Sequence, residues 1–307
     1  MREFDVVVIG AGIAGTTAAM TAARFGYRVG VVERMGPGGQ IINATHVENV
    51  PGLPQALSGI ELGPLLHEQA ESAGAEFILD TVESLAVDGA ERSLTCAGDT
   101  LGARAVIVAA GSSLRDLGIP GETALAGRGV SHCASCDGPF FRGRRVCVIG
   151  GGDAAFDEAL VLAEVATEVV VFHRAARPSA QRILVERAEQ LANVGLVGNT
   201  VVEEILGDGA VAGVRVRDLT SGTVREETLA AAFVFVGLEP NSRFLADRVR
   251  CDAAGHIETD ILMQTSLAGV FAAGDIRSKS VRLLAACAGD GATAAVSAHR
   301  YLQGAAS

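Results

Sequence analysis

The feature that most constrains the fold is a glycine-rich pattern that occurs twice, each time between a short apolar run and an alanine-rich segment. The first copy reads VVVIGAGIAG and the second reads VCVIGGGDAA. Short apolar runs ending in glycine indicate buried parallel strands, and the segments after them indicate helices. A strand, a glycine turn, a helix and a second strand make up a dinucleotide-binding βαβ unit. The sequence therefore predicts an α/β protein with two Rossmann-like dinucleotide-binding domains.

The glycines of each copy have separate mechanical roles. In the first copy, Gly10 permits a tight turn, Gly12 lets the backbone approach a pyrophosphate, and Gly15 lets the helix pack on the strand. The N-terminus of the following helix then faces the anion. Glycine turns occur in many proteins, but the flanking strands and helix favour nucleotide binding here. The second copy has, at the three equivalent positions, Gly150, Gly152 and Ala155.

The residue after the second strand separates the two sites. Glu33 stands about 20 residues after Gly12, where a carboxylate accepts hydrogen bonds from a ribose 2′-hydroxyl and repels a 2′-phosphate. The first site therefore suits the adenosine of FAD or NAD. The second copy has His173, Arg174 and Arg177 here, which favour a phosphorylated ribose, although a solvated basic turn would look the same. The second site is predicted to take a nicotinamide dinucleotide, with NADPH favoured.

The C-terminal part of the chain indicates how the two domains are connected. Each half ends on an apolar run followed by small residues, at 103–113 and at 230–241. The run 269–276 predicts one more strand, and an alanine-rich helix follows over 285–302, with no partner in the second half. We therefore expect these last elements to return to the first domain, so that the second domain is inserted into it.

Cys133 and Cys136 are the only cysteines close together in the sequence, within CASCDG. A zinc site would need two further ligands at suitable spacing, and neither His132 nor Cys147 completes a familiar set, so we expect no metal site. A three-residue separation allows a small reversible disulfide in which one thiolate is stabilised and the other is free to attack. Redox exchange is therefore the favoured interpretation. Asp137 follows directly and is either a proton donor or a turn residue.

Charge and composition exclude several functions. The net charge of −11 argues against nonspecific binding of nucleic acid, which needs clustered lysine and arginine. Hydrophobic residues make up 49% of the chain, yet no stretch approaches the roughly 18 apolar residues of a membrane span, and the run Val6 to Ile9 is too short for a signal peptide. Six cysteines in 307 residues do not make a disulfide framework. We therefore expect a cytoplasmic protein in a reducing compartment.

Six motifs together resemble the low-molecular-weight bacterial thioredoxin reductases in order and spacing. They are GAGIAG, GPGGQ, VENVPG, CASCDG, GGGDAA and GVFAAGD, beginning at residues 10, 36, 47, 133, 150 and 269. The resemblance spans nearly the whole chain, and CASCDG just before a second dinucleotide motif is its most specific part. It implies a homodimer whose FAD-binding domain, residues 1–117 and 245–307, carries an inserted NAD(P)H-binding domain, residues 118–244.

The resemblance also implies a reaction. Electrons pass from NADPH to FAD, then to the disulfide of Cys133 and Cys136, and then to a protein disulfide, by default that of thioredoxin. Cys136 would lie against the flavin, Cys133 would attack the substrate, and Asp137 would supply a proton. Phe140 and Phe141, just after the motif, are either core residues or a docking patch for thioredoxin.

The family pattern also assigns the cofactor contacts to particular positions. Flavin contacts are expected at Gly10, Gly12, Ala14, Gly15, Glu33, Arg34, Gly39, Gln40, Asn49, Val82, Ala110, Gly111, Gly274, Asp275, Arg282 and Leu283. Nicotinamide contacts are expected at Gly150, Gly152, Asp153, Ala154, His173, Arg174, Arg177 and Gly237.

Two departures from the family pattern leave alternatives open. The family writes the 2′-phosphate site as HRRxxxR, and this chain has Ala175 and Ser179 at two of those positions, so NADH is an alternative donor. Near the C-terminus the family's YRQA is replaced by VRLL, which keeps only Arg282. A dithiol oxidase, a ferredoxin-dependent reductase and a nonenzymatic redox sensor are therefore alternatives. The intact GGGDAA turn argues for a bound dinucleotide and hence for the reductase.

Overall fold

The structure, a computed structural model, describes residues 2–89, 91–245 and 247–304. The chain forms two units, one from Met1–Ser113 with Glu239–Ser307 and the other from Leu114–Leu238. The predicted α/β class, with a second Rossmann-like unit inserted into the first, is confirmed. The boundaries between the units, after Ser113 and after Leu238, lie slightly before the expected boundaries after 117 and 244. At the observed boundaries β7 (Ser112–Leu114) pairs with β16 (Leu238–Pro240).

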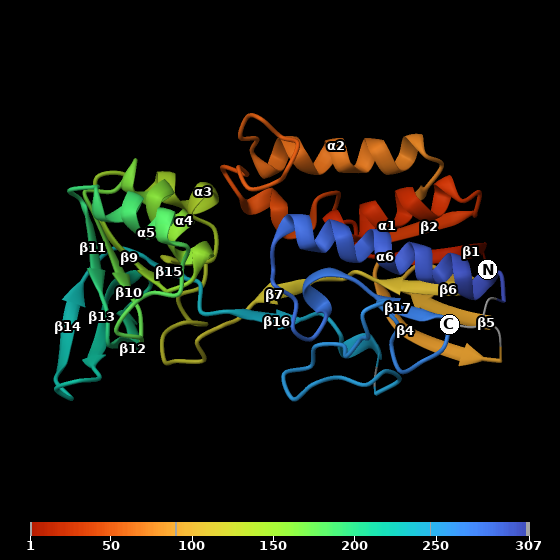
Figure 1. Cartoon of the computed structure of the whole chain (residues 1–307). Coiled ribbons are helices and arrows are strands. Elements are labelled where there is room, and N and C mark those ends of the chain that lie inside the picture. Colours follow the sequence, from red (N-terminus) through yellow and green to blue (C-terminus); the bar gives the residue numbers. More distant parts are fainter. Residues whose placement is uncertain (1, 90, 246, 305–307) are drawn as a thin grey trace. The chain divides into compact units, whose positions relative to one another are not determined.

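The sheet of the first unit is built on the first predicted βαβ unit (Figure 1). Its strands run in the order β3-β2-β1-β6-β5-β4, and β17 also pairs with β6. The pairs of β1 with β2 and β6, of β2 with β3 and of β6 with β17 are parallel, whereas β4, β5 and β6 pair antiparallel. The strands are β1 Arg2–Ile9, β2 Val29–Glu33, β3 Glu76–Leu79, β4 Val82–Asp88, β5 Glu91–Cys96, β6 Thr100–Val108 and β17 Val270–Ala272.

Helices α1 (Ile13–Arg24) and α6 (Leu284–Leu302) pack against each other over one face of this sheet, and α2 (Gly59–Ser72) packs on α1 (Figure 1). The small side chains of both helices permit a close approach, since a Cβ atom on Gly291 would lie 2.1 Å from the carbonyl oxygen of Ala14. The expected C-terminal strand and helix therefore do belong to the first unit. Short 3-10 turns complete it, at η1 Gly39–Asn43, η3 Arg243–Leu245 and η4 Gly274–Ile276.

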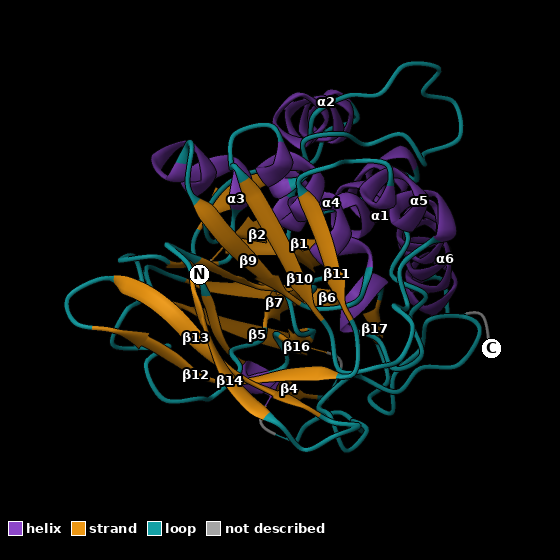
Figure 2. Cartoon of the chain, turned by 90° about the vertical axis from the view of Figure 1, so that its left-hand side faces the viewer, coloured by secondary structure: helices purple, strands orange, loops and turns teal. Residues whose placement is uncertain are grey.

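The second unit has a parallel sheet in the order β11-β10-β9-β15-β8 and an antiparallel sheet β12-β13-β14 (Figure 2). Alternate residues of β9 point to opposite faces of the parallel sheet: Val146 and Val148 pack with α4, and Cys147 and Ile149 pack with β12 and β13. The elements are β8 Val130–Ser131, α3 Ala134–Asp137, η2 Gly138–Phe141, β9 Arg145–Ile149, α4 Asp153–Ala163, β10 Glu168–Phe172, α5 Arg182–Glu189, β11 Val194–Val197, β12 Thr200–Gly207, β13 Val211–Asp218, β14 Val224–Thr228 and β15 Ala232–Val234.

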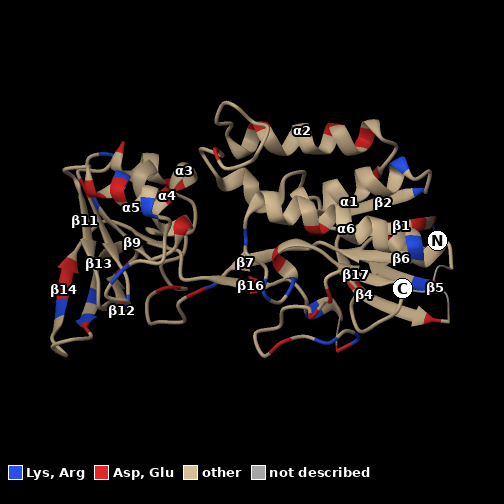
Figure 3. Ribbon diagram, viewed as in Figure 1, with Lys and Arg blue, Asp and Glu red and all other residues tan. Residues whose placement is uncertain are grey.

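Arginine and glutamate residues are mixed on the strands of the sheet β12-β13-β14, where blue and red segments of the ribbon lie together (Figure 3). Arg215 pairs with Glu204 and Glu226, and Arg217 pairs with Glu203. Opposite charges facing each other across strands support the pairing of this sheet. Within residues 2–89, 91–245 and 247–304, every helix is too short or too polar to traverse a lipid bilayer.

Candidate active site

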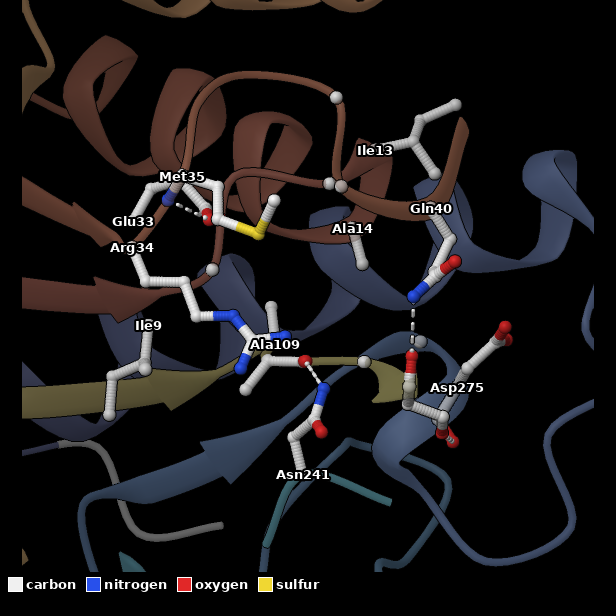
Figure 4. A pocket seen from close by; sticks show the side chains of 18 of the residues that line it. Ile9, Ile13, Ala14, Glu33, Arg34, Met35, Gln40, Ala109, Asn241 and Asp275 are labelled. Carbon is white, nitrogen blue, oxygen red and sulfur yellow. Dashed lines mark hydrogen bonds between the residues drawn. The ribbon is translucent and has the colours of Figure 1, made fainter. Parts of the chain in front are cut away.

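A cavity of about 320 Å³ opens in the first unit at the carboxyl ends of its parallel strands (Figure 4). The turn after β1 contributes Gly10 and Gly12, β2 contributes Glu33, and the residues that follow β6 and β17 contribute Gly111 and Asp275. Ligands of open α/β sheets bind at this edge, where the connections of neighbouring strands diverge. The cavity therefore lies where the first βαβ motif predicts a dinucleotide.

The three glycines of the first motif meet different surroundings. Gly10 has φ +103°, and a Cβ atom there would lie 2.4 Å from the carbonyl oxygen of Ala109. A Cβ atom on Gly15 would lie 1.9 Å from the oxygen of Gly10, whereas one on Gly12 would meet nothing closer than the oxygen of Gly38, at 3.9 Å. Gly12 also caps α1 with no side-chain hydrogen bond. Open backbone and uncapped N–H groups thus meet at the cavity, as a pyrophosphate requires.

Glu33 ends β2 with its carboxylate in the cavity wall (Figure 4). Its Oε2 atom accepts a hydrogen bond from the backbone N–H of Ala11 at 2.8 Å, and Oε1 accepts one from Met35 at 3.0 Å. A carboxylate has about four lone-pair positions, so it can still accept hydrogen bonds from ribose hydroxyls. The residues of this cavity therefore fit the adenosine and pyrophosphate of FAD.

Most of the expected flavin residues line this cavity: Gly10, Gly12, Ala14, Glu33, Arg34, Gly39, Gln40, Val82, Ala110, Gly111, Gly274 and Asp275. Four do not. Gly15 lies behind the turn, where it allows α1 to pack on Gly10. Asn49, Arg282 and Leu283 are exposed outside the lining, and Arg282 adopts φ +55° in the turn before α6. A direct flavin contact stays a prediction for all of the expected residues, and for these four the cavity lining does not support it.

Among the lining residues that the sequence analysis missed, Asn241 and Cys287 come from distant parts of the chain and make hydrogen bonds in the cavity wall. Asn241 donates from Nδ2 to the carbonyl oxygen of Ala110 at 2.8 Å and accepts from the Ser113 hydroxyl at 2.7 Å. Cys287 of α6 donates from Sγ to Asp275 at 3.2 Å, and burial followed by the Asp275 charge raises the pKa of its thiol. The sequence LEPN after an apolar run was a usable signal for Asn241, but an isolated cysteine in an alanine-rich helix gave none.

The second unit holds the disulfide of Cys133 and Cys136, whose Cα atoms are 5.3 Å apart. Helix α3 begins directly after Cys133, whose Sγ atom accepts the backbone N–H of Cys136 at 3.2 Å and lies 3.3 Å from the Ser135 hydroxyl. Cys133 is half-buried and Cys136 is exposed. Hydrogen-bond donors at a sulfur atom favour its thiolate. The local structure therefore favours Cys133 as the attacking sulfur. Asp137, the residue after Cys136, is half-buried, and its side chain forms no hydrogen bond with another described residue.

A buried carboxyl group contacts this motif from α4. Glu158 is 8% exposed, and its Oε2 atom accepts the backbone N–H of Ala134, between the two cysteines, at 2.5 Å. The pKa of Glu158 is raised to about 7: burial raises it most, the hydrogen bond from Ala134 lowers it, and the charge of Asp157 raises it. The sequence analysis missed this residue, because an acidic residue in an amphipathic helix is usually exposed. Glu158 holds the backbone of the redox motif and is a positioning residue.

The raised pKa makes the stability of the unit depend on Glu158 and on pH. The pKa of the Glu158 carboxyl is higher in the folded state than in the unfolded state. Its protonated form therefore stabilises the folded unit fully at pH values below the unfolded-state pKa. This stabilisation is lost as pH rises through about 7. We therefore expect Glu158→Gln to raise the free energy of unfolding near pH 8 by about 1–3 kcal/mol, and much less near pH 5. Urea unfolding of both proteins at the two pH values measures this difference.

The exposed Glu164 at the end of the same helix provides the control for that prediction. Glu164→Gln should change the free energy of unfolding by less than about 0.5 kcal/mol at either pH, as expected of a surface substitution. An effect of Glu158→Gln that is the same near pH 5 and near pH 8 would show that Glu158 does not titrate in this range.

The second glycine motif shapes the backbone in the same way. Gly150 has φ +152°, and a Cβ atom there would lie 2.2 Å from the oxygen of Phe235, while Gly152 caps α4 without a side-chain hydrogen bond. Asp153, in the first turn of α4, is held by the backbone and side-chain nitrogens of Gln181 at 2.7 and 2.6 Å. Ala154 follows it in the helix, and Gly237, at φ +129°, accepts the N–H of Arg115.

The three expected phosphate-binding residues do not share one environment. His173 is only 6% exposed, and a Cβ atom on Gly151 or Gly198 would meet its side chain at 3.1 or 2.9 Å. Burial lowers the pKa of His173 more than its hydrogen bond with Ala175 raises it, so the ring is neutral at pH 7. Arg174 and Arg177 are exposed and form no ion pair with another described residue. The two arginines, and not the histidine, present positive charge at this turn.

Known proteins resemble this chain over almost its whole length. Residues 4–292 match the family described as pyridine nucleotide-disulphide oxidoreductase. The thioredoxin reductase of Treponema pallidum (strain Nichols) is 39% identical over 300 residues, which cover 98% of this chain and 97% of the relative. The bifunctional thioredoxin reductase/thioredoxin of Mycobacterium leprae (strain TN) is 42% identical over 300 residues, 97% of this chain and 66% of the relative. A crystal structure of Lactococcus lactis thioredoxin reductase, described as the FR conformation, superposes with a TM-score of 0.96 at 38% identity, covering 98% of this chain and 99% of that one.

Proposed function

Because the chain belongs to the pyridine nucleotide-disulphide oxidoreductase family and is an FAD-dependent disulfide reductase of the thioredoxin reductase type, we propose specific roles for its residues. FAD is held by the first unit, and the second unit carries the nicotinamide site and the disulfide of Cys133 and Cys136. The observation that carries this assignment is that disulfide, bound to α3 and supported by Glu158, in a chain whose other unit has a dinucleotide cavity.

FAD held by the residues of the first-unit cavity would supply two-electron chemistry, linking hydride oxidation of the nicotinamide to reduction of the disulfide. The reduced pair is then oxidised by thiol–disulfide exchange, in which the Cys133 thiolate attacks a substrate sulfur and Cys136 attacks Cys133 to release the substrate as a dithiol. The N–H of Cys136 favours the thiolate at Cys133. We assign Asp137, next to Cys136, the role of proton donor to the leaving thiolate.

The cavity and the disulfide belong to different units, so each catalytic cycle requires the units to bring cofactor, disulfide and substrate together in turn. The chain passes between the units at two places, at β7 and β16, and two connecting strands suit a hinge. We propose that the inserted unit turns about these strands.

The disposition of Arg174 and Arg177 leads to a prediction about the electron donor. If these arginines bind the 2′-phosphate of NADPH, the double substitution Arg174→Ala/Arg177→Ala removes charge-assisted hydrogen bonds that, at these exposed positions, contribute about 1.5–3 kcal/mol in total. We expect KM for NADPH to rise about 10- to 100-fold while KM for NADH changes less than about twofold. Steady-state kinetics with both donors gives the ratio.

Arg248→Ala, a substitution of an exposed arginine in the first unit, is the control and should leave both KM values unchanged. Equal increases for NADPH and NADH would assign the arginines to the shared part of the dinucleotide. No increase for either donor would remove them from the site.

The substrate is proposed to be a thioredoxin. Support comes from the Mycobacterium leprae relative, which by its description combines thioredoxin reductase with thioredoxin. Phe140, three residues after Asp137 in η2, is 81% exposed, whereas Phe141 packs edge-on against Phe233 in the core. A large exposed aromatic residue beside a reactive disulfide is a suitable anchor for a protein substrate. Of the two roles that the sequence left open, we therefore assign the core role to Phe141 and the docking role to Phe140.

We expect Phe140→Ala to raise KM for thioredoxin about tenfold, which corresponds to about 1.4 kcal/mol, because it removes an interface anchor. Activity with a small aromatic disulfide should stay within about twofold, since that substrate contacts only the sulfur atoms. Exposed Leu219 in the turn after β13 offers a control, Leu219→Ala, with no expected effect. A loss of activity toward both substrates would instead indicate damage to the redox motif.

Two further properties are proposed with this function. The family resemblance supports a homodimer, with a mass of twice 31.4 kDa. Cys96, Cys147, Cys251 and Cys287 are free of disulfides, which supports a reducing, cytoplasmic environment. Steady oxidation of NADPH that depends on oxidised thioredoxin is the test of the whole proposal. NADPH consumption that depends only on oxygen would support the dithiol oxidase instead.

A further inference from the structure

A group of potential metal ligands lies in the second unit, directly before the redox motif. Asp116, Glu122 and His132 each offer one ligand atom, and these three atoms all lie within 4.8 Å of one another. Asp116 and Glu122 come from the loop after β7, and His132 follows β8 and precedes Cys133. No residue of this group takes part in the proposed electron transfer, so its arrangement needs another explanation.

The imidazole of His132 is oriented as in many metal ligands. Its Nδ1 atom lies 2.9 Å from the carbonyl oxygen of Val234. Because a carbonyl oxygen can only accept, Nδ1 carries the proton and Nε2 presents its lone pair. Nε2 faces Oδ1 of Asp116 at 3.4 Å. Two electron-pair donors that face each other at this distance are a favourable place for a proton or a cation, although the Asp116 side chain is itself 77% exposed.

Glu122 strengthens the case for a cation. Its side chain is buried at 4% exposure, and its two oxygens accept the backbone N–H groups of Leu117 at 2.8 Å and Gly118 at 2.7 Å. Within the described residues these neutral donors are its only hydrogen-bond partners. A buried carboxylate without a positive partner is costly, and each oxygen retains a lone pair that a metal ion can use.

We propose that Asp116, Glu122 and His132 bind one Zn²⁺ ion beside the redox disulfide. One imidazole and two carboxylates form a three-ligand zinc site with a fourth position open to water. Zinc bonds of about 2.0–2.1 Å at tetrahedral angles place two ligand atoms about 3.3 Å apart. The distance of 3.4 Å between His132 and Asp116 matches this value. The spacing of the three residues follows no familiar zinc motif, so the sequence analysis could not find it.

The position of the site gives the ion a structural role. Asp116 stands just after β7, by which the chain enters the second unit, and the His132 partner Val234 stands just before β16, by which it leaves. The ion would join these two segments through His132, next to Cys133. Zinc should therefore raise the unfolding temperature of the protein, because it binds the folded and not the unfolded chain.

Binding is measured with the oxidised, FAD-loaded protein, because its closed disulfide keeps Cys133 and Cys136 from binding metal. The chain is prepared without a histidine tag and in a Cys251→Ser background, since Cys251 is an exposed free cysteine near His256 and Asp252. Titration with zinc chloride in a calorimeter should show one ion per chain. Asp116→Asn and His132→Ala should each weaken binding at least about tenfold, by losing one ligand, and should abolish the rise in unfolding temperature.

His46→Ala removes an exposed histidine of the first unit and should leave zinc affinity unchanged. Glu122→Gln, which keeps one oxygen for the loop N–H groups, should also weaken binding. The proposal is overturned if the oxidised protein binds no zinc, which would leave a proton between His132 and Asp116. It is equally overturned if Asp116→Asn and His132→Ala bind zinc as tightly as the parent protein.

Discussion

Replacing either cysteine of the redox pair should reduce NADPH-dependent reduction of thioredoxin by about 1,000-fold or more, equivalent to about 4 kcal/mol of activation free energy. Each substitution leaves one sulfur, which cannot accept two electrons by opening a disulfide. Reduction of the bound flavin by NADPH should persist, because neither sulfur takes part in that step. Stopped-flow absorbance of the flavin and a coupled thioredoxin assay separate the two effects.

The two single variants should differ in one respect. In Cys136→Ser the free Cys133 thiol can attack oxidised thioredoxin, and the mixed disulfide should accumulate because no second thiol resolves it. In Cys133→Ser such a species should be scarce. Nonreducing gel electrophoresis detects the mixed disulfide, and Cys251→Ser, which removes an unpaired exposed cysteine, serves as the control. A stable mixed disulfide in Cys133→Ser and none in Cys136→Ser would reverse the assigned roles.

Gly12→Val should produce a folded protein that does not retain FAD. The position has φ −71° and ψ 178°, which valine readily adopts, and an added Cβ atom meets nothing closer than 3.9 Å. The new methyl groups therefore occupy the cavity beside the first turn of α1, where the pyrophosphate must approach the backbone. We expect FAD affinity to fall about 100-fold or more, which corresponds to about 2.7 kcal/mol. The flavin-to-protein absorbance ratio after purification and FAD titration of the apoprotein measure this loss.

Two other glycines give the controls for that prediction. Gly195→Val, in β11 of the second unit, also adds its Cβ atom to open space and should leave FAD binding unchanged. Gly15→Val places a Cβ atom 1.9 Å from the oxygen of Gly10 and should destabilise the apoprotein itself. If Gly12→Val retains FAD as tightly as the parent protein, the cofactor does not occupy this cavity.

The elements that the sequence predicted well are those whose pattern is local. The two strands that precede the glycine turns are almost completely buried, at Val6 to Ile9 and at Val146 to Ile149. Their uninterrupted apolar runs therefore predicted parallel strands correctly. The glycine after each run is fixed by backbone geometry, as at Gly10, and such requirements are visible in one sequence. Glu33 was found because its distance from the glycine turn is set by the length of one helix and one strand.

The features that the sequence did not predict depend on which distant segments meet. Cys287 and Asn241 join the cavity through α6 and the return from the second unit, and of the two only Asn241 has a local sequence signal. Glu158 looks like a surface residue of α4 until the structure places Ala134 against it. The burial of His173 likewise follows from contacts with Gly151 and Gly198. The sequence shows a histidine beside two arginines, but it does not show that this histidine is buried and neutral.

The most direct test of the central claim is to count the cysteines that NADPH reduces. The oxidised protein is mixed anaerobically with NADPH, quenched, alkylated under native conditions and analysed by peptide mass spectrometry. Before reduction, only Cys251 should react, because Cys96, Cys147 and Cys287 are buried and Cys133 and Cys136 are joined. NADPH should make both Cys133 and Cys136 reactive when FAD is bound and neither when it is absent. A flavin that NADPH reduces while Cys133 and Cys136 stay joined would contradict the account.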